Sequence, residues 1–228
     1  MFTPEELTAI GLSLKVATVA ALASLPPGIA CGWLLARRRF PGKTLLDALL
    51  HLPLVMPPVI TGYALLVVLG TQGPVGSWLL KHLGIQFAFR WTGAAVACAI
   101  MGFPLMVRAV RLSIEATDRR LEATAATLGA GPWRVFFSIT LPLAWPGLVA
   151  GVVLAFAKAL GEFGATITFV SNIPGETQTL SSAIYGLMQV PGMESGVWRL
   201  AGVALALSLA ALLLSEWLVR RPHPREED

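Results

Sequence analysis

Two ionisable residues stand four positions apart at the end of an apolar run. Lys158 and Glu162 follow residues 135–157, which contain no Asp, Glu, Lys or Arg. Side chains at this spacing share a helix face, so the two can form an ion pair. Charges within an apolar membrane segment are costly and usually face the interior of a bundle or water. The spacing therefore predicts either a structural ion pair or a polar step on a transport pathway.

The other residues that could do chemistry are too scattered for a catalytic or metal site. His51, His82 and His223 are far apart, and a metal site needs several ligands that converge. Cys31 and Cys98 lie in apolar runs, so we expect them to pack as small apolar residues. We therefore expect no catalytic residue, no metal and no cofactor in this chain, which is predicted not to be an enzyme.

One short motif could suggest nucleotide binding. Gly42-Lys43-Thr44 matches the end of a phosphate-binding loop, but Arg37 stands where that motif needs its first glycine. No strand pattern precedes it. We therefore expect any ATPase that works with this protein to be a separate chain.

The composition is that of an integral membrane protein. Of the 228 residues, 55% are hydrophobic and 13% are charged, whereas soluble domains carry about 25% charge. A membrane-spanning helix needs about 20 mostly apolar residues. The sequence predicts an all-α, polytopic helical bundle that forms a single transmembrane domain over residues 1–228. Five spans are expected, at about 10–35, 48–70, 91–111, 143–170 and 197–219. A broken or extra helix near 52–60 or 175–190 would make the number six.

Positive charge predicts the orientation of these spans. Most Lys and Arg residues follow the first, third and fifth spans, and the last group comprises Arg220, Arg221 and Arg225. Loops rich in positive charge stay in the cytoplasm. We therefore expect the N-terminus outside and the C-terminus in the cytoplasm, which requires an odd number of spans. The excess of Lys and Arg over Asp and Glu is explained by the orientation of the spans, so no nucleic-acid partner is expected.

A charged stretch, residues 118–142, interrupts the apolar runs within a predicted cytoplasmic loop at 112–142. Asp118 can cap a first short helix, Gly129 can end it, and Pro132 suits the start of a second. The stretch therefore predicts two short helices joined by a turn. On spacing alone, an ordinary loop and a docking element remain equally good interpretations.

Two other stretches should break their helices. Pro53, Met56, Pro57 and Pro58 lie within six residues, and proline removes a backbone hydrogen bond. Irregular backbone at membrane depth is tolerated inside protein or beside a water-filled cavity. Gly161 to Gly164, which includes Glu162 and Phe163, should loosen the helix there, and its free backbone N–H groups could meet an anion. Both stretches are candidate pathway elements, although a simple packing kink explains the first equally well.

Two weaker patterns remain in the sequence. Gly28 and Gly32 can form a small-residue face for another helix, or can be glycines that a membrane helix merely tolerates. Residues 71–90 contain Gly73-Pro74 and Gly76 and are expected to form an external loop.

The charged loop resembles the signature loop of ABC-importer permeases. The resemblance lies in Glu122-Ala123, Gly129-Ala130 and Ile139-x-Leu141-Pro142. In that family the loop is the coupling helix, which docks into a cleft on the ATPase subunit. The resemblance implies these ATPase-coupling residues: Glu122, Ala123, Ala125, Gly129, Ala130, Leu141 and Pro142.

A second resemblance indicates the branch of the family. Residues 160–177, LGEFGATITFVSNIPGET, look like the corresponding stretch of molybdate ABC-transporter permeases. Sulfate permeases share the Leu-Gly-Glu-Phe-Gly core, but the Ala-Thr-Ile-Thr-Phe run is more similar to the molybdate branch. The candidate pathway residues are Pro53, Met56, Pro57, Pro58, Glu162, Phe163 and Gly164.

The resemblance implies a multi-pass permease in the plasma (inner) membrane of a bacterium or archaeon. Two copies would form the pore within membrane lipid, and two separate ATPase subunits would dock on it. A periplasmic or lipid-anchored binding protein would deliver molybdate or tungstate. A sulfate or thiosulfate importer and a secondary transporter driven by an ion gradient remain as alternatives. A secondary transporter would typically show internal repeats.

Overall fold

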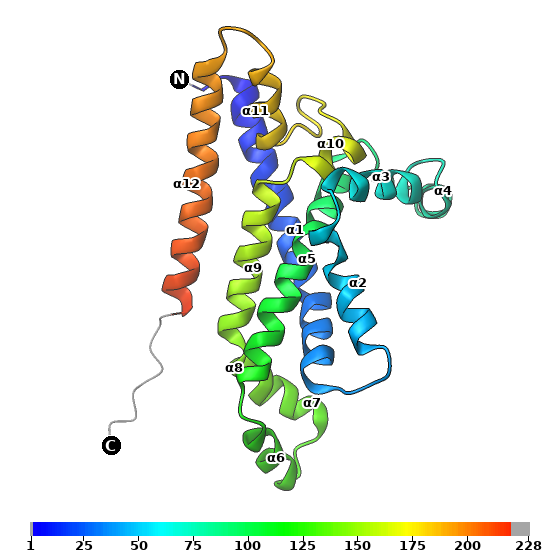
Figure 1. Ribbon diagram of the computed structural model, residues 1–228, viewed down its shortest axis with the longest axis vertical. Coiled ribbons are helices and arrows are strands. Elements are labelled where there is room, and N and C mark those ends of the chain that lie inside the picture. The colour runs from blue at the N-terminus through cyan, green and yellow to red at the C-terminus, as the bar shows by residue number, and fades with distance from the viewer. Residues whose placement is uncertain (1, 220–228) are drawn as a thin grey trace.

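Every regular element of the described chain is a helix. The computed structural model describes residues 2–219 (Figure 1). The basic residues Arg220, Arg221 and Arg225, on which the predicted orientation partly depends, lie outside this range. The elements are α1 Pro4–Arg37, α2 Lys43–Val55, α3 Pro58–Leu69, α4 Pro74–Leu83, α5 Trp91–Ala116, α6 Arg119–Thr127, α7 Pro132–Val135, the π-helix η1 Phe136–Thr140, α8 Leu141–Leu143, α9 Trp145–Leu160, α10 Gly164–Val170, α11 Leu180–Met188 and α12 Glu194–Val219.

Within the described chain, three helices are long and apolar enough to cross a membrane alone. They are α1, α5 and α12. Two bent pairs of segments, α2 with α3 and Pro132–Leu143 with α9, raise the number of possible spans to five by length and composition. The upper end of this range equals the five spans predicted from the sequence. The N-terminus and the α6–α7 loop lie at opposite ends of the bundle (Figure 1).

The second and fourth predicted spans are both interrupted where the sequence predicted breaks. The span expected at 48–70 bends by 109° between α2 and α3, because the Met56-Pro57-Pro58 sequence interrupts the helix. The span expected at 143–170 ends at Leu160, and the chain becomes helical again only at Gly164. A further bend of 67° precedes α9. The breaks fall where proline and glycine predicted them, but they divide the elements more than expected.

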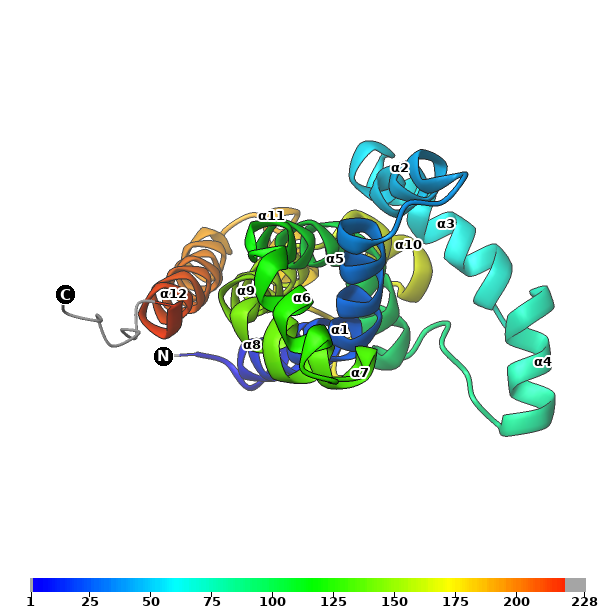
Figure 2. The ribbon, with the colours of Figure 1, turned by 90° about the horizontal axis from the view of Figure 1, so that it is seen from below.

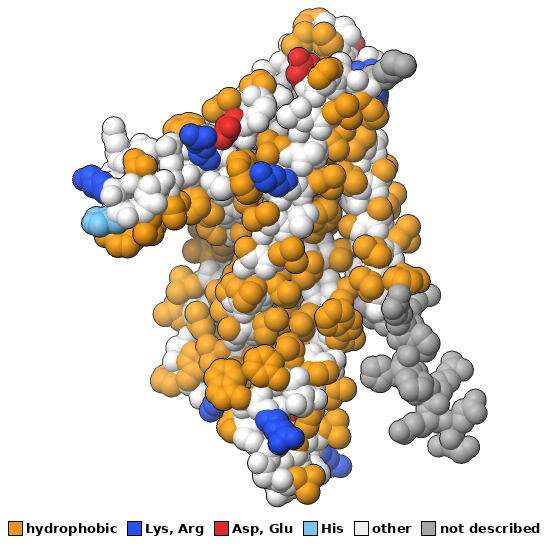
Figure 3. Space-filling view, turned by 180° about the vertical axis from the view of Figure 1, so that it is seen from behind, with side chains coloured by type: hydrophobic (Ala, Val, Ile, Leu, Met, Phe, Trp, Pro, Cys, Tyr) orange, Lys and Arg blue, Asp and Glu red, His pale blue; other side chains and the backbone are white. Residues whose placement is uncertain are grey.

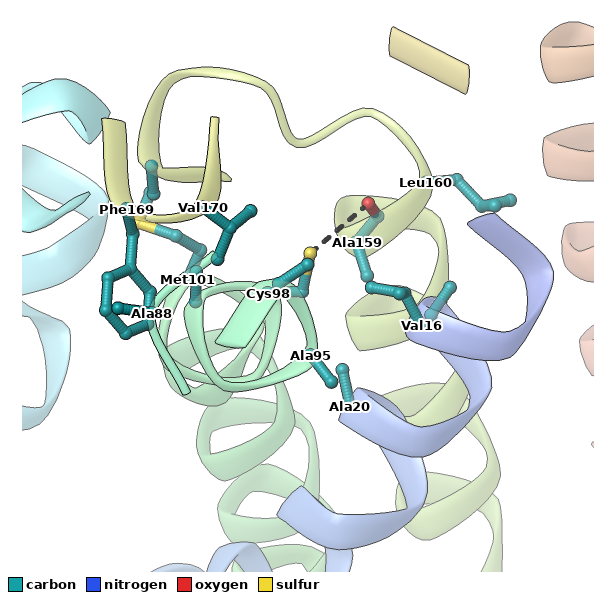
Figure 4. Packing of buried hydrophobic residues seen from close by; sticks show 14 residues of the cluster. Val16, Ala20, Ala88, Ala95, Cys98, Met101, Ala159, Leu160, Phe169 and Val170 are labelled. Carbon is teal, nitrogen blue, oxygen red and sulfur yellow. Dashed lines mark hydrogen bonds between the residues drawn. The ribbon is translucent and has the colours of Figure 1, made fainter. Parts of the chain in front are cut away.

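The core lies where α1, α5 and α9 pack together, and α10 closes it at one end (Figure 4). Its buried residues are mostly small, so the helix backbones can approach closely. Cys98 is buried there, and its thiol donates to the carbonyl of Ala159 (3.7 Å). Cys31 is also a free thiol. The prediction that both cysteines are packing residues is confirmed for Cys98, which lies in the centre of the cluster.

The small-residue face of α1 is confirmed. A Cβ atom on Gly28 would lie 2.6 Å from Met106 Cγ, and one on Gly32 would lie 2.8 Å from Val110 Cγ1. Both glycines therefore let α1 approach α5. The N-terminus of α1 is fixed by a capping box, in which Thr3 and Glu6 each accept a hydrogen bond from the other's backbone N–H.

The expected external loop at 71–90 is wrong in part, because α4 occupies its first half. Pro74 begins α4, and Gly84 ends it with a φ of +66°. Proline at a helix start and glycine just past its end are a recognised pair of signals. Together, α3 and α4 form an arm that projects sideways from the bundle (Figure 2).

The last helix, α12, lies on the outside of the bundle, and an ion pair fixes its N-terminal end. Arg199 Nη2 lies 2.7 Å from Glu6 Oε1, which joins the start of α12 to the start of α1. Only 6% of the most apolar stretch of α12 is buried, although the helix packs along α9 and Leu207 contacts the core cluster. On the face shown in Figure 3, hydrophobic side chains form a broad middle band, and charged side chains lie toward both ends. This distribution is typical of a protein that crosses a membrane.

Candidate functional site

The loop at 118–142 has the predicted design of two short helices and a turn. Asp118 Oδ1 accepts a hydrogen bond from the backbone N–H of Arg120 (2.9 Å), which caps α6. Gly129 follows α6 with a φ of +87°, a conformation that favours glycine. Pro132 then begins α7. The second helix does not stop after one turn, because it continues through η1 and α8 into the bend before α9.

The predicted coupling residues are spread over this loop. Ala123 is exposed and Ala125 is half-buried on α6, and Gly129 and Ala130 form the turn. Leu141, at the start of α8, packs against the cluster of buried residues shared by α1, α5 and α9. Pro142 lies exposed beside it. Leu141 and Pro142 therefore connect the loop to the bundle.

Glu122 faces the bundle. Its Oε1 atom accepts hydrogen bonds from Arg37 Nη2 (2.8 Å) and Thr140 Oγ1 (2.7 Å). Only 8% of the Arg37 side chain and 20% of the Glu122 side chain are exposed. A hollow of about 460 Å³ lies beside this pair, between the end of α1 and the loop. Neither Arg37 nor Thr140 was predicted as a functional residue, because nothing in the local sequence links Arg37 to a residue 85 positions away.

The outer surface of the same loop is apolar. Leu128 is 84% exposed, Trp133 is 76% exposed and Phe137 is 59% exposed. The rings of Trp133 and Phe137 stack with their centroids 6.2 Å apart. Large apolar side chains exposed together usually mark a contact with another protein or with a membrane.

Two of the predicted pathway residues, Pro58 and Gly164, meet where two broken elements touch. Pro53 lies inside α2, Met56 and Pro57 form the break, and Pro58 begins α3. A Cβ atom on Gly164 would lie 2.8 Å from Pro58 Cβ, so the N-terminus of α10 packs against that of α3. The structure thus brings Pro58 and the Gly161–Gly164 break together, although they are far apart in the sequence.

Lys158 and Glu162 form the predicted ion pair. Their Nζ and Oε2 atoms are 2.5 Å apart, and Glu162 is 2% exposed. Glu162 Oε1 also accepts a hydrogen bond from the backbone N–H of Ala165 (3.0 Å) at the start of α10. The sequence suggested that free N–H groups at this N-terminus could bind an anion. That expectation is wrong for the Ala165 N–H group, because this group already donates to the Glu162 carboxylate. Phe163, beside the pair, packs its ring against Tyr185 with a centroid separation of 4.8 Å.

Comparison with known sequences gives the family. Residues 28–224 match the profile of a family described as "Binding-protein-dependent transport system inner membrane component". The chain belongs to this family. It is therefore a multi-pass protein of the inner membrane, as the sequence predicted, and a membrane subunit of a transporter.

Similar full-length relatives of this inner membrane component are known. "Molybdenum transport system permease protein ModB" of Escherichia coli is 60% identical over 225 residues, which cover 99% of this chain and 98% of the relative. The protein of the same name from Haemophilus influenzae is 56% identical, with 95% and 94% covered. "Sulfate transport system permease protein CysT" of Escherichia coli is 38% identical, with 92% and 75% covered.

Solved structures with low sequence identity share the fold. A bacterial ABC transporter for the import of alginate superposes with a TM-score of 0.71 at 19% identity and covers 96% of this inner membrane component and 82% of its own chain. An inward-facing form of the MetNI methionine ABC transporter gives a TM-score of 0.74 at 16% identity, with 96% and 98% covered. At these identities the comparison establishes the arrangement of the helices.

Proposed function

We propose that this chain is the permease subunit of an ATP-driven importer of molybdate, with tungstate as a second cargo. Two copies form the translocation pathway, two separate ATPase subunits dock on their cytoplasmic loops, and a periplasmic or lipid-anchored binding protein delivers the anion. The observation that carries the proposal is the 60% identity, over nearly the full length, to a relative named as a molybdenum transport permease. The relative named for sulfate is 38% identical, and sulfate is therefore the second candidate cargo.

The loop at 112–142 is the part of the chain best suited to couple the two kinds of subunit. It lies at the end of the bundle where α1 and α5 finish (Figure 1), and it exposes an apolar surface around Leu128 and Trp133. We assign the docking surface to this apolar side. Ala123 and Gly129 are exposed on the same loop, Ala130 faces the hollow beside Glu122, and Leu141-Pro142 transmits the displacement to α9.

We assign the pathway to the α3–α10 contact and the residues beside it. Pro53, Met56, Pro57 and Pro58 allow the chain to turn away from the bundle axis, and Glu162, Phe163 and Gly164 begin the element that packs against them. Transport then needs no covalent chemistry in this chain. It is an equilibrium between outward-open and inward-open states, which the ATPase and the binding protein bias.

The Gly129→Pro variant is expected to insert normally but to lose ATP-driven uptake. Proline holds φ near −65°, whereas Gly129 has a φ of +87° and donates its N–H to Ala126 O (3.0 Å). The turn between α6 and α7 would therefore be lost. Uptake and membrane abundance should be measured together. Gly131→Ala is the matched control, because a Cβ atom there would contact nothing within 4 Å. Wild-type uptake by Gly129→Pro would contradict the coupling role.

The proposed cargo is tested by uptake into proteoliposomes. The complex should contain this chain, the ATPase that co-purifies with it and its binding protein. We expect ATP-dependent molybdate uptake that a large excess of sulfate barely reduces. Uptake of sulfate in preference to molybdate would keep the importer and change its cargo. Uptake that follows an ion gradient, with no co-purifying ATPase, would overturn the proposal.

A further inference from the structure

Glu122 belongs to the motif that suggests ATPase docking, yet its carboxylate is used inside the permease. One oxygen, Oε1, receives a hydrogen bond from Arg37 at the end of α1 and another from Thr140 in η1. Four-fifths of the Glu122 side chain is buried. The carboxylate therefore joins α6 to two other elements of its own chain.

Arg37 holds the other end of this link. Its side chain is 92% buried, and its Nη2 atom also donates to the carbonyl of Thr117, the residue that ends α5 (3.3 Å). A second arginine crosses in the opposite direction, since Arg119 Nη2 at the start of α6 donates to Ala36 O in the last turn of α1 (3.3 Å). The end of α1 and the α5–α6 corner are thus joined in both directions.

We propose that Arg37 and Glu122 form an internal strut that transmits displacement of α6 to the α1–α5 pair. Arg37 is then a positioning residue for coupling, and Glu122 acts through it, while contact with the ATPase is left to the exposed side of the loop. This inference rests on the proposed coupling function and specifies how the loop moves the bundle.

The anchoring of the strut supports this role. Coupling between distant sites is carried by rigid elements joined through packed side chains and ion pairs. Gly28 and Gly32 bring α1 into close contact with α5, so the two helices present a stiff support to Arg37. The π-helix η1 places Thr140 on the same carboxylate oxygen, and π-helical turns occur frequently at functional sites. Displacement of α6 would therefore move the α1–α5 pair, because Arg37 and Arg119 tie the short α5–α6 connection to the end of α1.

The test compares uptake with ATP hydrolysis in the same proteoliposomes, with the ATPase and binding protein present. In Arg37→Ala and Glu122→Ala, the ATPase should still co-purify and hydrolyse ATP, but anion uptake per ATP should fall roughly tenfold or more. The double variant Arg37→Glu with Glu122→Arg should recover much of that ratio. Arg37→Lys should be intermediate, because lysine keeps the charge but lacks the planar fork that reaches both Glu122 and Thr117.

Arg39→Ala is the matched control, since Arg39 is an exposed arginine two residues away and should leave the ratio unchanged. The strut is overturned if Arg37→Ala keeps the wild-type ratio. It is also overturned if Glu122→Ala releases the ATPase while Arg37→Ala does not, because Glu122 would then contact the ATPase directly. Release of the ATPase by both variants would assign the pair to docking and would overturn its role in transmission.

A second measurement separates this inference from the choice of cargo. Trypsin cleaves after the exposed Arg120 in α6, so cleavage of the purified chain reports how firmly the loop is held. Arg37→Ala should be cleaved there faster than wild type, and Arg37→Lys, which keeps the positive charge and adds no cleavage site in α6, should be cleaved at an intermediate rate. If Arg37→Ala is cleaved after Arg120 at the wild-type rate, the proposed strut is overturned. Failure of the wild-type complex to import molybdate, with this cleavage pattern intact, would overturn only the proposed cargo.

Discussion

The Glu162→Ala variant is expected to be strongly destabilised and to lose uptake. Removing one partner of a buried ion pair leaves the other charge uncompensated, which costs roughly 3 kcal/mol, near the lower end of the usual range because Lys158 remains partly exposed. The same change removes the acceptor for the Ala165 N–H group, a loss of about 1 kcal/mol for a helix cap. Thermal unfolding of the purified protein and uptake by the complex measure the two effects.

A double variant distinguishes a structural pair from a polar step in the pathway. Lys158→Met with Glu162→Gln removes both charges, and the Gln side chain can still accept the Ala165 hydrogen bond. Replacing both members of a buried pair is often neutral, so this variant should regain most of the lost stability. If it also regains uptake, then the pair is structural. If stability returns without uptake, then the charges themselves take part in transport. A single Glu162→Ala protein as stable as wild type would contradict the prediction.

The Gly62→Ala variant is expected to separate α3 from α10 and to abolish most uptake. A Cβ atom on Gly62 would lie 2.4 Å from the carbonyl oxygen of Ala165 and 2.9 Å from its Cα atom. These are backbone atoms and cannot rotate away, so the two helices must move apart. Overpacking of this kind costs about 1–3 kcal/mol. Because the proposed pathway lies at this contact, uptake should fall by more than the loss of folded protein alone would cause.

Gly202→Ala in α12 is the control for this experiment. A Cβ atom there would contact nothing within 4 Å, and alanine is more favourable than glycine within a helix by about 1 kcal/mol. Gly202→Ala should therefore transport like wild type with equal or greater stability. Normal uptake by Gly62→Ala would show that the α3–α10 contact is not part of the pathway.

Local chemistry determined much of what the sequence could predict. Asp118, Gly129 and Pro132 each act within one or two turns of their own position, so the design of the loop was predictable. The spacing of Lys158 and Glu162 was enough to predict their pairing, because both members lie on one helix face. The helix α4 was missed although its signals were present, since Gly73-Pro74 was interpreted as a turn when Pro74 begins a helix that Gly84 ends.

Contacts between distant segments could not be predicted. The pairing of Arg37 with Glu122 and the approach of Gly62 to Ala165 depend on how α1, α3, α6 and α10 are placed in space. A single sequence shows which residues could pair, but each Arg has many possible carboxylate partners. The bend of 109° after α2 has the same cause, because the prolines predict a break and the neighbouring helices determine its angle.

The position of α12 has a consequence for the membrane around the subunit. An ion pair between Arg199 and Glu6 fixes its first turns, and α9 supports it farther along, but most of its apolar surface faces away from the bundle. Lipid tails solvate such a surface as well as other apolar side chains do. The helix therefore forms an outer wall of the subunit, whose apolar side chains meet the surroundings of the protein along most of its length.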